Sequence, residues 1–97
     1  YLCAFSSERE ITADDVNILL NGAYEGLPVE KSIIQMVINE MYARYGYQFT
    51  SVEIQNYFNN KTWYQNIAIG TTDMDSIYNS MTDIEKKNIE FLKTQNQ

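Results

Sequence analysis

The 97-residue sequence contains no histidine, a single cysteine, and seven basic residues against 13 acidic ones. The absence of histidine removes the commonest general base and the commonest metal ligand, which excludes Ser-His-Asp and Cys-His catalysis. Cys3 cannot form an internal disulfide, and without a second cysteine or any histidine it cannot anchor a zinc site. We therefore expect no metal site, no cofactor and no catalytic residue of these types.

Positive charge and long apolar runs are also scarce. The formal net charge is −6, and the basic residues form no cluster longer than the pair Lys86 and Lys87, so a phosphate backbone would be repelled. Unbroken apolar runs such as Ile18 to Leu20 are far shorter than the roughly 20 residues that span a bilayer. We expect neither a nucleic-acid partner nor a membrane-spanning segment in this chain.

The apolar content is sufficient for one small folded domain over residues 1–97. Val, Ile, Leu and Phe make up 24 of the 97 residues, above the ~20% below which disorder is favoured. The periodicity of these residues predicts a mainly α bundle of about four helices. The predicted helices cover residues 13–21, 28–45, 51–59 and 83–94. A short helical turn is predicted over 75–79, a loop from the Trp63-Tyr64 pair through Gly70, and an extended edge at the N-terminus.

Helix starts are marked by capping boxes, in which a hydroxyl residue lies three positions before an acidic one. Three such pairs precede the predicted helices: Thr12 with Asp15, Thr50 with Glu53, and Thr82 with Glu85. Each predicts that the helix begins immediately after the threonine.

The helix predicted over 28–45 has apolar residues on most of its circumference. Pro28 suits its first turn, and Gly46 suits its end. One side carries a long apolar stripe, and the opposite side carries small or weakly polar residues rather than charged ones. Because a helix that is apolar on several sides is buried, we expect this helix to be central and covered on two sides.

Asn39 and Asn88 fall within faces otherwise made of apolar or small side chains. A buried amide without partners costs about 1–3 kcal/mol. We therefore interpret both as structural residues that bind the backbone of a neighbouring segment, with ligand contact as the alternative.

Glu40 and Arg44 are spaced i, i+4 on the predicted central helix. An exposed pair of this kind contributes a few tenths of a kcal/mol. Alternatively, Arg44 packs on an aromatic ring and its guanidinium holds a loop carbonyl or a ligand carboxylate.

More than half of the 13 aromatic residues lie between Tyr42 and Tyr64, and core packing is their ordinary role in a small domain. An exposed subset could instead stack on a sugar or grip a peptide. The ligand-binding residues hypothesised from the sequence are Arg44, Tyr47, Trp63, Tyr64 and Glu40.

The run Asn39-Glu40-Met41-Tyr42-Ala43-Arg44-Tyr45-Gly46-Tyr47, followed by Phe49, Tyr57-Phe58 and Trp63-Tyr64, resembles the bacterial YARHG domain family, which is named for its Tyr-Ala-Arg-His-Gly motif. Ser7, Arg9 and Ile11-Thr12 extend the resemblance toward the N-terminus, and Ile84 to Ile89 extend it toward the C-terminus. Two departures are Tyr45 in place of the family histidine and Ile38 where an arginine is common. Since a phenol titrates near 10, Tyr45 could not replace a catalytic histidine at neutral pH.

The resemblance implies an extracytoplasmic domain attached to bacterial envelope proteins, with no established activity. The sequence therefore predicts a non-catalytic binding or interaction module of a cell-envelope or secreted protein. Cell-wall glycan or peptide, or other domains of the parent protein, are the expected partners. The alternatives are a cell-wall hydrolase that uses carboxylates such as Glu40 and Glu53, and a purely structural spacer.

Overall fold

The computed structural model describes residues 2–22, 24, 32–67 and 70–95. These residues form one 3-10 helix and six α-helices, and no strand occurs among them. The 3-10 helix η1 spans Ala4–Ser7. The α-helices are α1 (Ala13–Asn21), α2 (Ile33–Ala43), α3 (Val52–Asn59), α4 (Thr62–Gln65), α5 (Met74–Ser80) and α6 (Asp83–Gln95). The mainly α fold class is confirmed.

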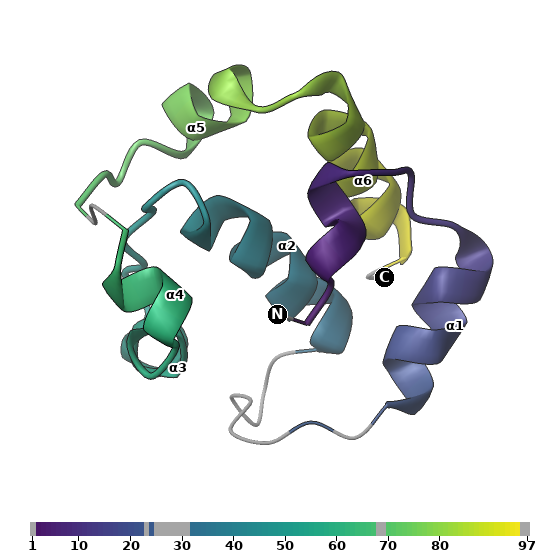
Figure 1. The fold of residues 1–97 in the computed structure, drawn as a ribbon, viewed down its shortest axis with the longest axis horizontal. Coiled ribbons are helices and arrows are strands. Elements are labelled where there is room, and N and C mark those ends of the chain that lie inside the picture. Colours follow the sequence, from purple (N-terminus) through teal and green to yellow (C-terminus); the bar gives the residue numbers. More distant parts are fainter. Residues whose placement is uncertain (1, 23, 25–31, 68–69, 96–97) are drawn as a thin grey trace.

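Helix α2 lies at the centre of the molecule, with α3 and α4 on one side and η1, α1 and α6 on the other (Figure 1). Every residue of α2 except Gln35 is buried. The prediction of a central helix covered on more than one side is therefore confirmed. Its packing partners include α6, α1 and α5.

The bounds of the central helix are narrower than predicted. Ser32 is the N-cap, and its hydroxyl accepts a hydrogen bond from the Gln35 N–H at 3.0 Å. The helix therefore begins at Ile33, and Pro28 lies outside the described residues. It ends at Ala43 because Gly46 adopts a φ of 85° and the Gly46 N–H donates back to the Ala43 carbonyl at 2.9 Å.

The capping boxes at Thr12 and Thr82 are confirmed. The Asp15 N–H donates to the Thr12 hydroxyl and the Asp15 carboxylate accepts from the Thr12 N–H. The same reciprocal pair links Thr82 and Glu85. Both helices consequently begin where the sequence predicts, at residues 13 and 83.

The capping box at Thr50 is wrong by one residue. The hydroxyl of Ser51, not of Thr50, accepts from the Ile54 N–H, at 3.4 Å, so α3 begins at Val52. The Gln55 side chain also binds the main chain ahead of this helix, because its carbonyl accepts the Phe49 N–H at 2.8 Å. Two adjacent hydroxyl residues are candidates for the cap, and the structure uses the second, Ser51.

Replacing Ser51 with alanine should lower the free energy of unfolding by about 1 kcal/mol, because the Ile54 N–H loses its acceptor. Replacing the exposed Thr50 with alanine should change it by less than about 0.5 kcal/mol. Urea unfolding of the two variants measures the difference. Equal losses would show that the Ser51 cap contributes nothing in solution.

Three further segments differ from the prediction. The N-terminal segment is not an extended edge: it contains η1, whose turn is closed by the Ser6 N–H donating to the Cys3 carbonyl at 3.3 Å. The Trp63-Tyr64 pair lies on α4 rather than in a loop. The turn predicted over 75–79 is the longer helix α5, capped by Asp73.

Candidate functional site

Glu40 and Arg44 form an ion pair on one face of α2, with 2.8 Å between Arg44 Nη2 and Glu40 Oε1. Their side chains are only 2% and 14% exposed. The Glu40 carboxylate accepts the main-chain N–H groups of Leu2 at 2.6 Å and Cys3 at 3.1 Å. Both oxygens are therefore engaged by the N-terminal segment.

The Arg44 guanidinium, which is the other partner of the ion pair, binds the same N-terminal segment. Nη2 donates to the Cys3 carbonyl at 2.6 Å, and Nη1 donates to the hydroxyls of Ser6 at 2.6 Å and Ser7 at 3.2 Å. Of the two interpretations of Arg44, the one in which it holds a loop carbonyl describes this geometry.

Asn88 binds the N-terminal segment from α6 and is 1% exposed. Its Oδ1 accepts the Ile11 N–H at 2.7 Å, and its Nδ2 donates to the carbonyls of Ser6 at 2.7 Å and Arg9 at 2.9 Å. The prediction that this amide binds the backbone of a neighbouring segment with both its ends is confirmed.

Asn39 is also buried, at 4% exposed, but the prediction about its partners is wrong. Its amide accepts from Gln35 Nε2 at 3.0 Å and donates to the sulfur of Met36 at 3.6 Å. Both partners are side chains of its own helix. A side chain one turn away satisfies the amide locally, so no neighbouring backbone is needed.

Glu85, at the start of α6, joins three elements. Its carboxylate accepts from the Tyr45 hydroxyl at 2.5 Å, from the Ser7 hydroxyl at 2.7 Å and from the Thr82 N–H at 2.9 Å. The Tyr45 hydroxyl therefore points to a carboxylate, although the side chain is 37% exposed.

The Tyr45–Glu85 contact affects both titrations. Burial acts to raise the pKa of Glu85, but the hydrogen bonds, with that from Tyr45 the strongest, outweigh it and hold the pKa below its ordinary 4.5. Burial, aided by the hydrogen bond to Glu85, raises the pKa of Tyr45 to about 12. The pair is therefore held as a neutral phenol and a carboxylate across the neutral range.

Replacing Tyr45 with phenylalanine should lower the free energy of unfolding at pH 7 by about 1 kcal/mol, because Glu85 loses a charge-assisted hydrogen bond at a partly exposed position. When folding lowers the pKa of a carboxyl group, the ionised group stabilises the folded state at pH values above its unfolded pKa. This contribution is lost as the pH falls through the folded pKa. The difference between variant and parent should therefore shrink below about pH 4.5. Urea unfolding from pH 7 to 3 measures it.

Tyr78 provides a matched control, because its hydroxyl donates to an exposed carboxylate, Glu90, at 3.3 Å. Its replacement by phenylalanine should leave the pH dependence of the parent unchanged. A Tyr45→Phe difference that stays constant from pH 7 to 3 would contradict the coupling to Glu85.

Of the hypothesised aromatic ligand-binding residues, two are buried. Tyr64 is fully buried and donates its hydroxyl to the Tyr47 carbonyl at 2.7 Å, while the Tyr47 ring is 9% exposed. Trp63 is half-buried and makes an edge contact with the ring of Phe58. The rings of Tyr47 and Tyr64 consequently pack in the core, and Trp63 presents part of its surface to solvent.

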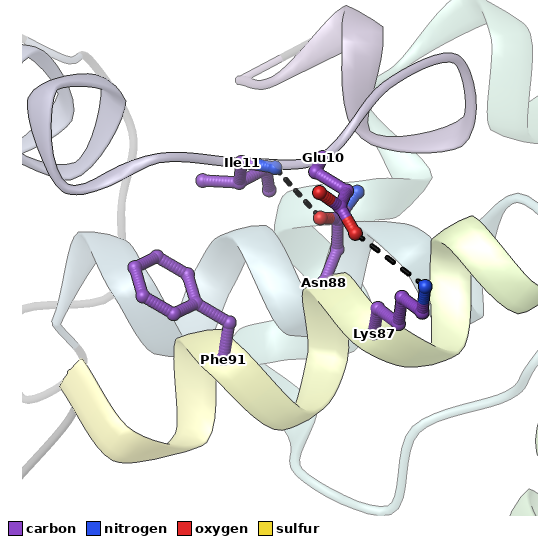
Figure 2. Close-up of a pocket in the computed structure, with 5 residues that line it drawn as sticks. All are labelled: Glu10, Ile11, Lys87, Asn88 and Phe91. Atoms are coloured by element: carbon purple, nitrogen blue, oxygen red, sulfur yellow. Dashed lines mark hydrogen bonds and ion pairs between the residues drawn. The ribbon is translucent and has the colours of Figure 1, made fainter.

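A pocket of about 200 Å³ lies where the chain before α1 crosses α6. Figure 2 shows Ile11 and Glu10 on one side of it and Phe91, Asn88 and Lys87 on α6 opposite. Glu10 and Lys87 form an exposed ion pair at 3.6 Å. Sequence reasoning identified Asn88 but missed the four other residues, because the pattern does not show that the Asn88 bonds to Ile11 and Arg9 bring residues 10 and 11 onto this helix.

Within the described ranges no group of three or more Cys, Asp and Glu side chains is placed to hold a metal ion. No helix in the same ranges is long and apolar enough to cross a membrane.

The fold and its polar contacts define a small all-α domain in which a central helix and the last helix hold an N-terminal segment by its main chain. The model of one family, described as YARHG domain, matches residues 28–97, and the chain belongs to this family. Neither the curated proteins nor the solved structures compared with the chain gave a significant match. Glu40, Arg44 and Asn88 lie within the matched region, whereas the segment that they bind precedes it.

Proposed function

We propose that the domain is a non-catalytic binding module of a bacterial cell-envelope or secreted protein, and that it binds one end of a cell-wall peptide in the pocket on α6. The extracytoplasmic location is proposed from the family. The observation that carries the ligand class is the composition of the pocket, which combines an apolar wall with two opposite charges.

The chemistry of the pocket suits a short peptide better than a neutral glycan. Glu10 would attract an ammonium group and Lys87 a carboxylate, while Phe91 and Ile11 would contact an aliphatic side chain. At about 200 Å³ the pocket is smaller than the roughly 300–1,000 Å³ that accommodates a drug-sized ligand. It would therefore take a peptide end rather than a whole ligand.

The surroundings of Glu40 support a binding role over the alternative of hydrolysis. A glycosidase needs an acid and a base that face a sugar. Glu40 is 2% exposed, and both its oxygens accept hydrogen bonds from within the domain. A substrate would have to displace the N-terminal segment to reach it.

Titration of the isotope-labelled chain with purified muropeptides, followed by amide NMR, tests the proposal. We expect shifts at residues 10–11 and 87–91, and none with peptide-free glycan. Lys87→Ala should abolish the shifts. Lys93→Ala is the matched control, because Lys93 is also an exposed lysine on α6 with an ion pair at 3.6 Å.

Other outcomes would overturn the proposal in distinguishable ways. Shifts centred on Trp63 with glycan alone would favour stacking of a sugar on that ring. No shift with either ligand would favour the spacer. Release of sugar fragments that is lost in Glu40→Gln would favour the hydrolase.

A further inference from the structure

The pocket on α6 carries two opposite charges side by side. Glu10 Oε1 and Lys87 Nζ lie 3.6 Å apart, which is longer than the about 2.7–2.9 Å of a charge-assisted hydrogen bond. The two side chains are 65% and 69% exposed. An exposed ion pair contributes little to stability because water screens it. A ligand can therefore separate the two side chains at little cost.

The other polar groups around the pocket are already bonded within the domain. Asn88 donates both of its Nδ2 hydrogens to main-chain carbonyls, and its Oδ1 accepts a main-chain N–H. An amide group has only two N–H donors, so Asn88 has none left for a ligand. Arg9, which precedes Glu10, has its guanidinium at the Asp15 carboxylate, at 2.8 Å. Recognition of a polar ligand therefore falls to the side chains of Glu10 and Lys87.

An apolar wall lies directly beside the two charges. Phe91 is one turn after Lys87 on α6, and Ile11 follows Glu10 in the chain (Figure 2). Phe91 is only half-buried, so its side chain presents surface that a ligand can contact. The pocket volume of about 200 Å³ corresponds to several water molecules at roughly 30 Å³ each. The pocket therefore offers room for one charged head group on a short alkyl chain.

The spacing of the two charges selects among ligand end groups. Where an amino group and a carboxyl group share one carbon, bonds of about 1.46 and 1.52 Å at about 111° place the nitrogen roughly 2.5 Å from the carboxyl carbon. These ligand charges are close together, as Glu10 and Lys87 are, and each can face its opposite on the protein. An end group with a single charge would pair with one side chain and leave the other without its counterion.

We propose that the pocket binds a zwitterionic amino-acid end, in which an ammonium and a carboxylate share one carbon at the end of an aliphatic chain. Glu10 binds the ammonium, Lys87 binds the carboxylate, and the aliphatic chain contacts Phe91. This inference rests on the proposed function and narrows its ligand to a cell-wall peptide with a side chain that ends in a free amino and a free carboxyl group. A free amino acid presents the same chemistry, and the experiment distinguishes the two sources.

Amide NMR titration of the full chain with two isomers tests the charge spacing. L-norleucine carries both charges on one carbon, whereas 6-aminohexanoate has the same formula and net charge but carries the charges at opposite ends of its chain. We expect norleucine to shift residues 10–11 and 87–91. It should bind at least about threefold more tightly than its isomer, N-acetylnorleucine or norleucinamide. Equal affinity for all four compounds would overturn the proposal.

A substitution at Glu10 assigns the ammonium to its partner. In Glu10→Gln, norleucine should lose its advantage over N-acetylnorleucine, because the ammonium has lost its carboxylate, but keep its advantage over norleucinamide. Glu10 is exposed, so the change should not unfold the domain. Glu8→Gln is the matched control, since Glu8 is an exposed glutamate two residues earlier, and it should leave both preferences unchanged. An unaltered preference in Glu10→Gln would overturn the proposal.

A pair of muropeptides separates this proposal from the proposed function. One has a side chain that ends in a free amino and a free carboxyl group on one carbon, and the other has that carboxyl group amidated. We expect the second to bind at least about threefold more weakly. Equal binding of the two would overturn the zwitterion proposal and leave the muropeptide function standing. Binding of norleucine but of neither muropeptide would support the pocket chemistry for free amino acids and overturn the cell-wall ligand.

Discussion

Replacing Glu40 with alanine is expected to lower the free energy of unfolding by about 3–5 kcal/mol, the range for removing one partner of a buried ion pair. The change leaves Arg44, whose side chain is 14% exposed, without its carboxylate and removes the acceptor of two main-chain N–H groups. Small domains are stable by about 5–15 kcal/mol, so the variant would retain only part of its stability. Urea unfolding followed by circular dichroism measures the loss.

Glu8→Ala is the matched control, since it removes the same charge from an exposed position in the N-terminal segment that Glu40 binds. It should change the free energy of unfolding by less than about 0.5 kcal/mol. A Glu40→Ala loss below about 1 kcal/mol would contradict the structural role of the ion pair. It would also indicate that residues 2 and 3 leave Glu40 accessible in solution.

The sequence predicted the first residue of a helix correctly where a single hydroxyl residue could serve as its N-cap. Thr12 and Thr82 each have a single acidic partner three positions on, and both helices begin as expected. At Thr50 and Ser51 two candidate caps are adjacent, and the choice depends on how Gln55 binds the chain at Phe49. The bond between Gln55 and the Phe49 main chain lies outside the hydroxyl–acid pattern, so that pattern could not resolve the choice.

The N-terminal segment was mispredicted for a related reason. Its conformation follows from contacts to residues almost 40 positions away on α2 and almost 80 positions away on α6. The sequence shows that Glu40 and Arg44 can pair, but it does not show which main chain lies over them. The pocket was missed with the segment, because one of its walls is residues 10 and 11.

Asn39 and Asn88 show that the sequence can predict burial of a polar side chain without predicting its hydrogen-bond partners. Their positions on apolar faces correctly predicted burial for both. Burial requires partners but does not specify them. Asn39 has Gln35 one turn before it and is satisfied there, whereas Asn88 is bonded to the chain that crosses α6.

Because Asn88 binds main-chain groups and Asn39 does not, we expect a second large loss of stability when Asn88 is replaced. Replacing Asn88 with leucine should lower the free energy of unfolding by about 2–4 kcal/mol, although the new side chain is apolar and the site is 1% exposed. The Ile11 N–H and the carbonyls of Ser6 and Arg9 lose their partners, and an unsatisfied buried group costs about 1–3 kcal/mol. Partial access of water to the Arg9 carbonyl keeps the sum below three full penalties.

Asn39→Leu makes the identical substitution where, among the residues that the structure describes, no main-chain group depends on the amide. It should change the free energy of unfolding by less than about 1 kcal/mol, because the partners it abandons are a flexible Gln35 side chain and the weakly accepting sulfur of Met36. Thermal unfolding of the two variants measures the difference. Because both variants introduce the same leucine side chain, the comparison needs no assumption about the free energy gained by burying it. If Asn39→Leu destabilised as much as Asn88→Leu, burial of leucine volume rather than lost backbone partners would account for both.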